Sequence, residues 1–224
     1  GIGSSLLEAV RREFADAVDW LGTGFGATPD LLRFWRENGY STVHLSTSRN
    51  AASGEHSAVM LAPTGDAGRA LHDRHASRFV RRIGAVLTDA LDAVDPDVVS
   101  GGLRATDVGL PASPEGRFAL GEAEWRLVAS AAYGPGLLDV DPGPFRRLSI
   151  RHLVDPADPD ALTERETRLL VLKVLQARGW GKVAEALDYD SRRECMRALG
   201  DAFQPLVDAY GTEAALAERD RYLE

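Results

Sequence analysis

The run GTGFGATPDLLRFWRENGY, residues 22–40, decides the fold. It overlaps the short apolar, glycine-containing run 20–25, which predicts a strand that permits a close backbone approach. The Thr-Pro-Asp sequence at 28–30 supplies an N-cap hydroxyl, a proline at the first helical position and an acidic first turn. Gly39 then ends the helix at about Asn38. The run therefore predicts a strand followed at once by a well-capped helix.

The segments on either side of this run extend the pattern. An apolar stripe with helical spacing predicts a helix over 4–18. Alternating residues predict strands over 42–47 and 56–61, and the short polar loop between them predicts that these strands pair antiparallel. The order helix, strand, helix, strand, strand indicates an α/β (α+β) domain.

Most of the remaining sequence has helical periodicity. Residues 63–75, which contain proline, glycine and aspartate, are expected to form a connector, and residues 95–115 and 134–145 are rich in loop-forming residues. Helices are predicted over 76–94, 122–133, 160–178, 180–187 and 191–203, with one or two short helices after them.

The composition excludes several classes of protein. No apolar stretch is long enough to cross a membrane, and no secretory signal is visible, so the expected location is the cytoplasm. A single cysteine, Cys195, excludes a disulfide framework and a multi-cysteine zinc site, and it is expected to be buried and inert. The histidines are too scattered for a metal site. The first residue is glycine, so we expect a piece of a longer protein.

The net charge of −8 argues at first against a nucleic-acid partner. However, Lys173 and Lys182 are the only lysines, so 24 of the 26 basic residues are arginines. An acidic, lysine-poor composition suggests a salt-adapted proteome or a GC-rich genome. Local arginines could still bind phosphates, and the net charge is therefore weak evidence about partners.

The N-terminal sequence Gly1-Ile2-Gly3-Ser4 leads directly into the first predicted helix. Two glycines allow a tight turn with exposed N–H groups, and the helix N-terminus adds the positive end of its dipole. This combination suits a pyrophosphate. The same residues could instead form only a flexible terminus or an ordinary turn.

The order of elements resembles the second half of the GNAT acetyltransferase fold. More specifically, the run 22–40 together with RNAASGEHSAVML, residues 49–61, resembles the tRNA(Met) cytidine acetyltransferase family, which makes N4-acetylcytidine in RNA. The segments LTERETRLLVLKVLQARGW, residues 162–180, and SRRECMRALGDAF, residues 191–203, are similar to the C-terminal part of archaeal members.

This resemblance implies a domain organisation. Residues 1–62 would be the C-terminal half of a GNAT domain, 63–75 a connector and 76–224 a helical tRNA-binding region. Acetyl-CoA and tRNA would be the partners, with the wobble cytidine of elongator tRNA(Met) as the target and no membrane association. ATP, with Mg²⁺, would be used by a helicase-like module in a missing part of the parent protein. The oligomeric state remains open.

The resemblance also implies cofactor-binding residues. Gly1, Ile2, Gly3 and Ser4 would belong to the acetyl-CoA loop, and Asp30 would contact the cofactor. Asp30 could equally serve only to compensate the helix dipole. Where the family's bacterial pattern has a basic residue near the end of this helix, the chain has Glu37, and Arg36 is the candidate substitute.

His56 is the candidate catalytic residue. It follows Glu55 at the start of the last predicted strand, where a GNAT substrate amine would arrive. An imidazole titrates near neutral pH and could accept the proton of the reacting amine, with Glu55 orienting it or acting itself. The alternative is a histidine with only a structural hydrogen bond. Phe34 and Trp35 are expected to pack in the core rather than to stack on a base.

Two arginine clusters could bind RNA phosphates. The helices 180–187 and 191–203 have the spacing of a helix-turn-helix, and three arginines lie in the first two turns of the second helix. A further cluster precedes them, and the alternative for both is a helical bundle with solvated charges. The candidate residues are Arg146, Arg147, Arg151, Arg192, Arg193 and Arg197.

Two other functions remain open at this point. The chain could belong to a GNAT enzyme that acts on a protein or a small amine, although most such enzymes end near the last strand. It could also be a non-enzymatic RNA-binding or assembly module, in which the GNAT half is only a scaffold.

Overall fold

The computed structural model describes residues 1–51, 54–108, 116 and 118–224. The chain forms two compact units. One unit contains residues 1–86 and 93–109, and the other contains residues 87–92 and 110–224. The predicted boundaries at 62 and 75 remain a prediction about the organisation of the protein.

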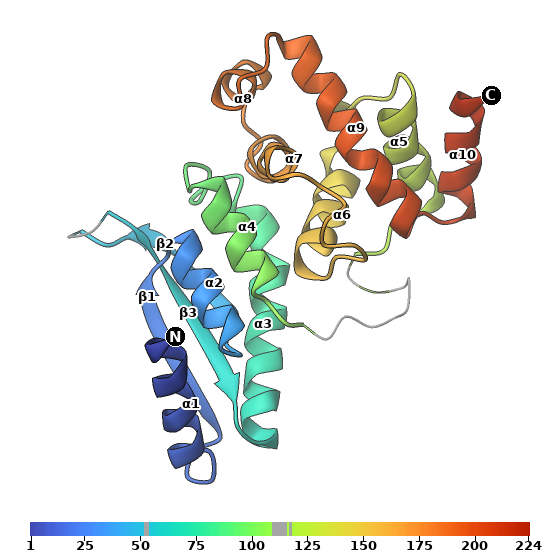
Figure 1. Cartoon of the computed structure of the whole chain (residues 1–224). Helices are drawn as coiled ribbons and strands as arrows, with labels where there is room; N and C mark the ends of the chain where they lie inside the picture. The colour runs from blue at the N-terminus through green and yellow to red at the C-terminus, as the bar shows by residue number, and fades with distance from the viewer. Residues whose placement is uncertain (52–53, 109–115, 117) are drawn as a thin grey trace. The chain divides into compact units, whose positions relative to one another are not determined.

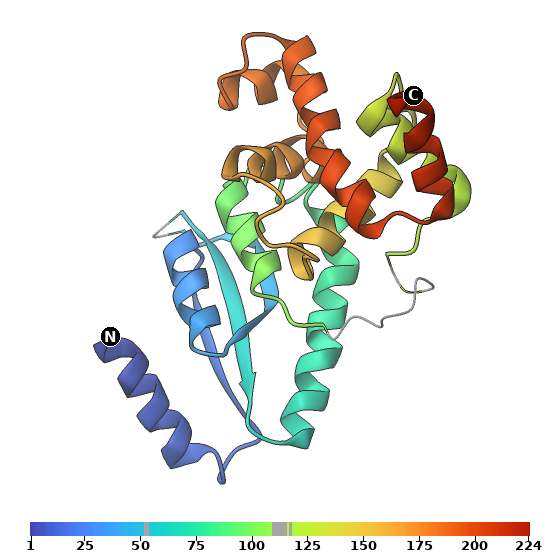
Figure 2. The ribbon, with the colours of Figure 1, turned by 45° about the vertical axis from the view of Figure 1, so that its right-hand side comes forward.

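The first unit consists of a small sheet with helices around it (Figure 1). Its elements are α1 (Ile2–Phe14), β1 (Trp20–Gly26), α2 (Pro29–Glu37), β2 (Ser41–Arg49), β3 (His56–Pro63), α3 (Asp66–Val86) and α4 (Pro96–Arg104). Figure 2 shows α1 at the margin of the unit, and none of its residues is buried.

The sheet has the strand order β1-β3-β2, and β3 pairs antiparallel with both neighbours. The predicted antiparallel pair, β2 and β3, is confirmed, and so is the α/β (α+β) class. β3 comes last in the sequence but lies between the other two strands. Trp20 is paired with Pro63 at one end of the β1–β3 ladder, and Gly26 with Ser57 at the other. His56 therefore lies at the end of the sheet where β1 leads into α2.

The predicted start and end of α2 are confirmed. The Thr28 hydroxyl accepts a hydrogen bond from the Leu31 N–H at 3.3 Å, and Pro29 is the first helical residue. Gly39 follows with a φ of 83°, a left-handed conformation that favours glycine. The ring of Trp35 lies against Phe25, Phe34 and Tyr40, with centroid distances from 4.8 to 6.0 Å. Phe34 and Trp35 thus pack against other aromatic rings of this unit.

Two helices of the first unit depart from the expected pattern. α3 begins at Asp66, inside the predicted connector, because the N–H groups of Thr64 and Gly65 both bond the Asp19 carbonyl and turn the chain early. α4 occupies a stretch expected to be loop-rich, and that expectation is wrong. Pro96 stands at the first helical position after the Asp95 N-cap, where proline is favoured.

The second unit is a bundle of helices. Its elements are α5 (Glu122–Tyr133), η1 (Leu138–Val140), α6 (Pro142–Val154), α7 (Glu164–Leu169), the π-helical η2 (Leu170–Leu175), α8 (Trp180–Ala186), α9 (Arg192–Tyr210) and α10 (Glu213–Leu223). α6 begins within residues 134–145, a stretch expected to be rich in loops, because Asp141 caps the helix and Pro142 is its first residue. α9 continues past the predicted end at 203.

The core of this bundle forms around two phenylalanines on different helices. Phe145 of α6 and Phe203 of α9 meet edge to face at 5.1 Å, and both are buried. Cys195 is fully buried in the same apolar cluster. Burial raises the pKa of its thiol, which keeps the reactive thiolate scarce at neutral pH. The expectation of a buried cysteine is confirmed.

We expect opposite effects from the same substitution at two helical glycines. A Cβ at Gly68 in α3 would overlap the Asp19 carbonyl oxygen, so Gly68→Ala should destabilise the first unit by more than 1–2 kcal/mol, as overpacking against backbone does. A Cβ at Gly102 in α4 would meet nothing within 4 Å, so Gly102→Ala should stabilise it by about 0.5–1 kcal/mol. Urea denaturation measures the free energy of unfolding of both variants. If Gly68→Ala stabilised the unit as Gly102→Ala does, the packing at Gly68 would be contradicted.

Candidate functional site

The first candidate feature is the N-terminus of α1. The helix begins at Ile2 with Gly1 as its N-cap, so the expected glycine loop forms the cap and first turn of the helix. The Ser5 N–H donates to the Gly1 carbonyl at 3.1 Å, which is the first hydrogen bond of the helix. The N–H groups before Ser5 therefore have no acceptor within the helix. A Cβ at Gly3 would stand 3.2 Å from Cζ of Phe34. Gly3 therefore also permits the close approach of α1 to α2.

The cofactor candidates on α2 lie at its two ends. Asp30, in the first turn, is exposed and forms an ion pair with Arg33, as well as facing the positive end of the dipole. Arg36 and Glu37 lie in the last turn, both exposed. Six residues of helix separate Asp30 from Arg36, or about 9 Å along the axis. The structure does not bring these candidates together.

His56, by contrast, is held in a defined orientation. The side chain is buried, and its Nδ1 lies 2.8 Å from the carbonyl oxygen of Ser46. A carbonyl can only accept a hydrogen bond, so Nδ1 carries the proton and donates it. The ladder between β2 and β3 shifts register between Leu45 and Arg49, and the Ser46 carbonyl lies in this irregular stretch. In the neutral ring, the Nε2 lone pair is thus the proton acceptor.

Glu55 lies against the end of β1. Its carboxylate occupies the space that a Cβ would fill at Gly26, so the glycine makes room for it. The Ala27 N–H donates to the His56 carbonyl at 2.7 Å, so the residues next to Gly26 and Glu55 are also joined through the backbone. Glu55 and His56 therefore lie together beside the junction of β1 and α2. The sequence did not identify Gly26 as a residue that makes room for Glu55. The only signal was its position in the Gly-Phe-Gly run before Ala27.

The first arginine cluster, on α6, makes contacts within its own unit. Arg146 donates from Nε to the Val174 carbonyl at 3.1 Å, which satisfies an acceptor in the π-helical turn. Arg147 forms an ion pair with Glu124 of α5, and that hydrogen bond lowers the pKa of the Glu124 carboxyl.

Arg151, the third member of this cluster, lies over the ring of Tyr210 at 4.5 Å. All three arginines of α6 thus have partners inside the protein.

The second arginine cluster is exposed. Arg192, Arg193 and Arg197 lie in the first two turns of α9, away from the face that buries Cys195. Ser191 caps the helix by accepting a hydrogen bond from the Glu194 N–H at 3.1 Å. The Arg192 guanidinium lies against Gly181 of α8, and all three arginines are exposed near the N-terminal end of α9.

The turn between α8 and α9 is fixed by a residue that sequence reasoning missed. Arg165 donates to the carbonyls of Leu187 and Asp188, at 3.0 and 2.9 Å, and its guanidinium lies 3.9 Å from the Tyr189 ring centre. Asp188 adopts a φ of 56°, so the turn is tight. The predicted helix–turn–helix is present as two helices with a braced turn.

No group of three or more His, Cys, Asp or Glu side chains in the described residues is arranged to hold a metal ion. None of the helices in the described part of the chain is long and apolar enough to span a membrane.

Comparisons with known proteins agree with this architecture. The family model described as GNAT acetyltransferase 2 matches residues 3–65, which include α1 and all three strands. Proteins named tRNA(Met) cytidine acetyltransferase TmcA match almost the whole chain. The Haloferax volcanii protein is 56% identical over 99% of the chain, and the Haloarcula marismortui protein is 55% identical over all of it.

A bacterial protein of the same name, from Nitrosococcus halophilus, is 35% identical over 99% of the chain. The chain spans only 28–29% of the length of these three curated relatives. Because the similarity extends through both units at this level of identity, the whole chain matches one part of these tRNA(Met) cytidine acetyltransferases.

Proposed function

We propose that this chain is part of an RNA acetyltransferase that transfers an acetyl group from acetyl-CoA to the N4 amine of cytidine in tRNA. The observation that carries the proposal is the 55–56% identity, over the whole chain, to two relatives named for that activity. The wobble cytidine of elongator tRNA(Met) is the proposed target, and the cytoplasm is the proposed location. ATP hydrolysis, with Mg²⁺, is assigned to a module outside these 224 residues.

The proposed proton acceptor is Nε2 of His56. The N4 lone pair of cytosine is delocalised into the ring, so positive charge develops on N4 only as it attacks the thioester carbonyl. As the N4–carbonyl bond forms and the carbon–sulfur bond of the thioester breaks, Nε2 would take the proton from N4, and the CoA thiolate would leave and could be protonated by the imidazolium. The Nδ1–H bond to the Ser46 carbonyl would keep the ring oriented. Glu55 is the proposed alternative acceptor, with its carboxylate beside Gly26 at the end of β1.

The proposed anchor for acetyl-CoA is the N-terminus of α1. Its first-turn amides, from Gly1 to Ser4, and the helix dipole suit a pyrophosphate, and no Cβ at Gly1 or Gly3 blocks the approach. When bound, acetyl-CoA supplies the activated acyl group. A contact from Asp30 would have to compete with its ion pair to Arg33. Arg36 and Glu37 could reach only a part of the cofactor near the far end of α2.

The proposed RNA contacts in the second unit are made chiefly by Arg192, Arg193 and Arg197, because their guanidinium groups are exposed. A phosphate contact by Arg146, Arg147 or Arg151 would have to replace the contacts that these residues already make. The alternative of a protein or small-amine substrate is disfavoured by the similarity in the second unit, which extends beyond the GNAT match.

A chimera tests the whole proposal. This chain would replace the matching segment of the Haloferax volcanii relative in a strain that lacks the native gene, and mass spectrometry would measure N4-acetylcytidine in tRNA. Restored acetylation supports the proposal. A chimera that folds and binds acetyl-CoA but acetylates only protein or small amines would support the alternative enzyme. A chimera that binds tRNA without any transfer would support the non-enzymatic module.

Gly3→Asp should abolish acetyl-CoA binding in this chimera. The new carboxylate would stand beside the first-turn amides and repel the pyrophosphate. Gly3→Ala is the control for packing, because its methyl group also approaches Phe34 but carries no charge. Calorimetric titration with acetyl-CoA measures both variants, and unchanged affinity in Gly3→Asp would refute the anchor.

His56→Ala should lower the rate of tRNA acetylation by the chimera about 100-fold, the usual effect of losing a general base. Acetyl-CoA affinity should change little, because the proposed anchor is on α1. Single-turnover assays measure the rate. A rate near that of the parent would make His56 a structural residue that only ties β3 to Ser46.

Arg147→Gln should destabilise the second unit by roughly 1 kcal/mol, because its ion pair with Glu124 is only partly exposed. Since the pair lowers the folded-state pKa of Glu124, its contribution is present above the unfolded pKa and is lost as pH falls through the folded one. Denaturation at neutral and acid pH should therefore show a smaller difference in acid. The matched control, Arg193→Gln, is exposed and should leave stability unchanged at both pH values.

A further inference from the structure

A group of arginines on α3 has no part in the site described above. α3 carries five arginines and two aspartates, in a chain whose net charge is −8. Arg69 is paired with Asp107 at 3.3 Å, and the Asp73 carboxylate lies 2.9 Å from Nδ1 of His72. The remaining four form what we call the α3 arginine stripe: Arg74, Arg78, Arg81 and Arg82.

The spacing of the stripe places its charges on one side of α3. Arg74, Arg78 and Arg82 recur every four residues, so their positions follow one another at about 6 Å along the helix axis. Arg74, Arg78 and Arg81 are exposed. Arg82 is half-buried and donates from Nη2 to the Leu45 carbonyl at 2.7 Å, which ties the end of the stripe to β2.

A cavity of about 520 Å³ lies between this stripe and the part of the sheet that α3 leaves open. Its wall on the sheet includes Trp20, Val59 and Leu61, and Phe79 contributes from the helix. Trp20 and Val59 are 44% and 36% exposed, so both side chains can be reached from the recess.

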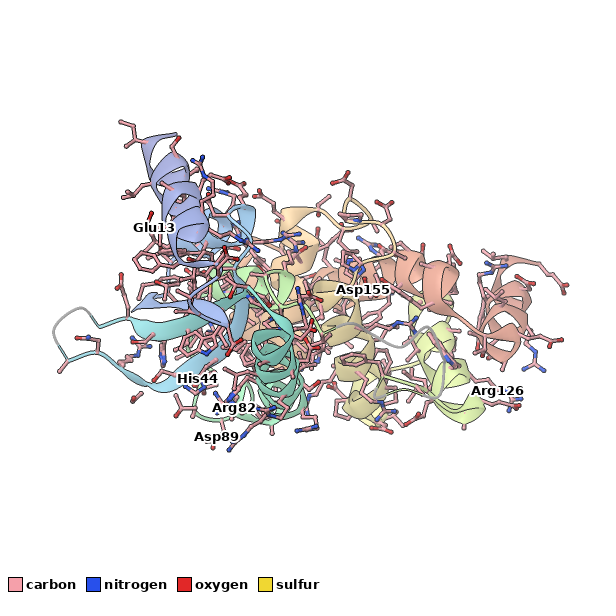
Figure 3. The ribbon with its side chains drawn as sticks, turned by 90° about the horizontal axis from the view of Figure 1, so that it is seen from below. Glu13, His44, Arg82, Asp89, Arg126 and Asp155 are labelled. Atoms are coloured by element: carbon pink, nitrogen blue, oxygen red, sulfur yellow. The ribbon has the colours of Figure 1, made fainter. Side chains whose placement is uncertain are left out.

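His44 stands at the edge of the recess beside Arg82 (Figure 3). A guanidinium can only donate, so at 3.2 Å Nδ1 of His44 accepts from Arg82 and that ring nitrogen carries no proton. Burial lowers the pKa of His44, and the charges of Arg82 and Arg78 lower it further. The charges of Arg82 and Arg78 therefore give the edge of the recess a positive potential, and no carboxylate takes part in the contact between His44 and Arg82.

We infer that the α3 arginine stripe and the adjoining recess bind single-stranded RNA, with phosphates on the arginines and one unstacked base in the recess. Single-stranded nucleic acid alternates phosphates with flat bases, which matches a cationic stripe beside a cavity lined by Trp20 and Phe79, and the proposed function selects RNA. An acidic peptide would satisfy the arginines but would leave the recess unused. The inference rests on the proposed function only in taking RNA as the substrate.

The recess is separate from the candidate catalytic residue. Val59 lies three residues from His56 along β3, or about 10 Å at the rise of a strand. Because successive side chains of a strand point to opposite faces, Val59 and His56 lie on opposite faces of the sheet, and the site would hold a part of the RNA away from the reacting cytidine.

The test compares two triple variants of the whole chain with the same loss of charge. One is Arg74→Gln, Arg78→Gln and Arg81→Gln, which spares the Arg82 contact to β2. The matched control is Arg12→Gln, Arg33→Gln and Arg69→Gln, because these exposed arginines form ion pairs in the same unit. Fluorescence anisotropy measures the binding of a labelled, cytidine-rich oligoribonucleotide at several salt concentrations, and circular dichroism checks the fold.

The stripe variant should bind about tenfold more weakly at low salt or worse, and its slope of log K against log salt should fall by about two units, at roughly 0.7 per phosphate contact. The control should keep most of the affinity and slope. Inorganic polyphosphate should compete less well than RNA of equal charge, because it has no base for the recess.

Three results would overturn the inference. If both triples bind like the parent, the stripe makes no phosphate contact, and the proposed function keeps its contacts on α9. If polyphosphate competes as well as RNA, no base enters the recess. If the parent chain binds no RNA at all, the RNA-binding part of the proposed function fails together with this site.

Discussion

The insertion of β3 between β1 and β2 is the constraint on which the first unit depends. A strand that arrives last and pairs on both edges fixes the register of the sheet, because its residues Ala58 to Leu61 have partners on both sides. That register brings His56 to the end of β1, where the Ala27 N–H bonds its carbonyl. The irregular stretch of β2 then offers the Ser46 carbonyl to the imidazole. The proton acceptor proposed for catalysis is thus oriented by sheet pairing and a bulge, without a dedicated loop.

Close backbone approaches at three glycines complete this geometry. Gly26 leaves room for the Glu55 carboxylate, Gly68 for the Asp19 carbonyl, and Gly3 for the ring of Phe34. A Cβ would overlap the backbone of Asp19 at Gly68 and displace the Glu55 carboxylate at Gly26, whereas at Gly3 it would only tighten the contact with Phe34. Helix propensity alone would favour alanine at Gly68 and Gly3, so packing outweighs propensity at these positions.

Local signals made the sheet and α2 predictable, since Thr28, Pro29 and Gly39 specify a helix through contacts within a few residues. α4 could not be predicted in this way. Pro96 and Gly101 look like helix breakers in isolation, yet the proline is the first helical residue and the glycine lies where a Cβ would be 3.4 Å from Leu32 of α2. The same limit applies to the site: the sequence pointed to His56 and Glu55, but the partner of the imidazole and the role of Gly26 depend on strand pairing.

Arginine has two physical roles in this chain, and contacts inside the protein separate them. Arg147 donates to the carboxylate of Glu124 and joins two helices, and Arg165 donates to two backbone carbonyls and braces a turn. Arg74, Arg78 and the arginines at the start of α9 are exposed. Sequence alone ranks a cluster by its number of charges and would treat these groups alike. A phosphate gains most from a guanidinium whose donors are not already committed, because no internal contact must first be broken. In an acidic protein with almost no lysine, that criterion favours two helix faces for the proposed RNA contacts, α3 in one unit and the start of α9 in the other, although the net charge of −8 would repel RNA.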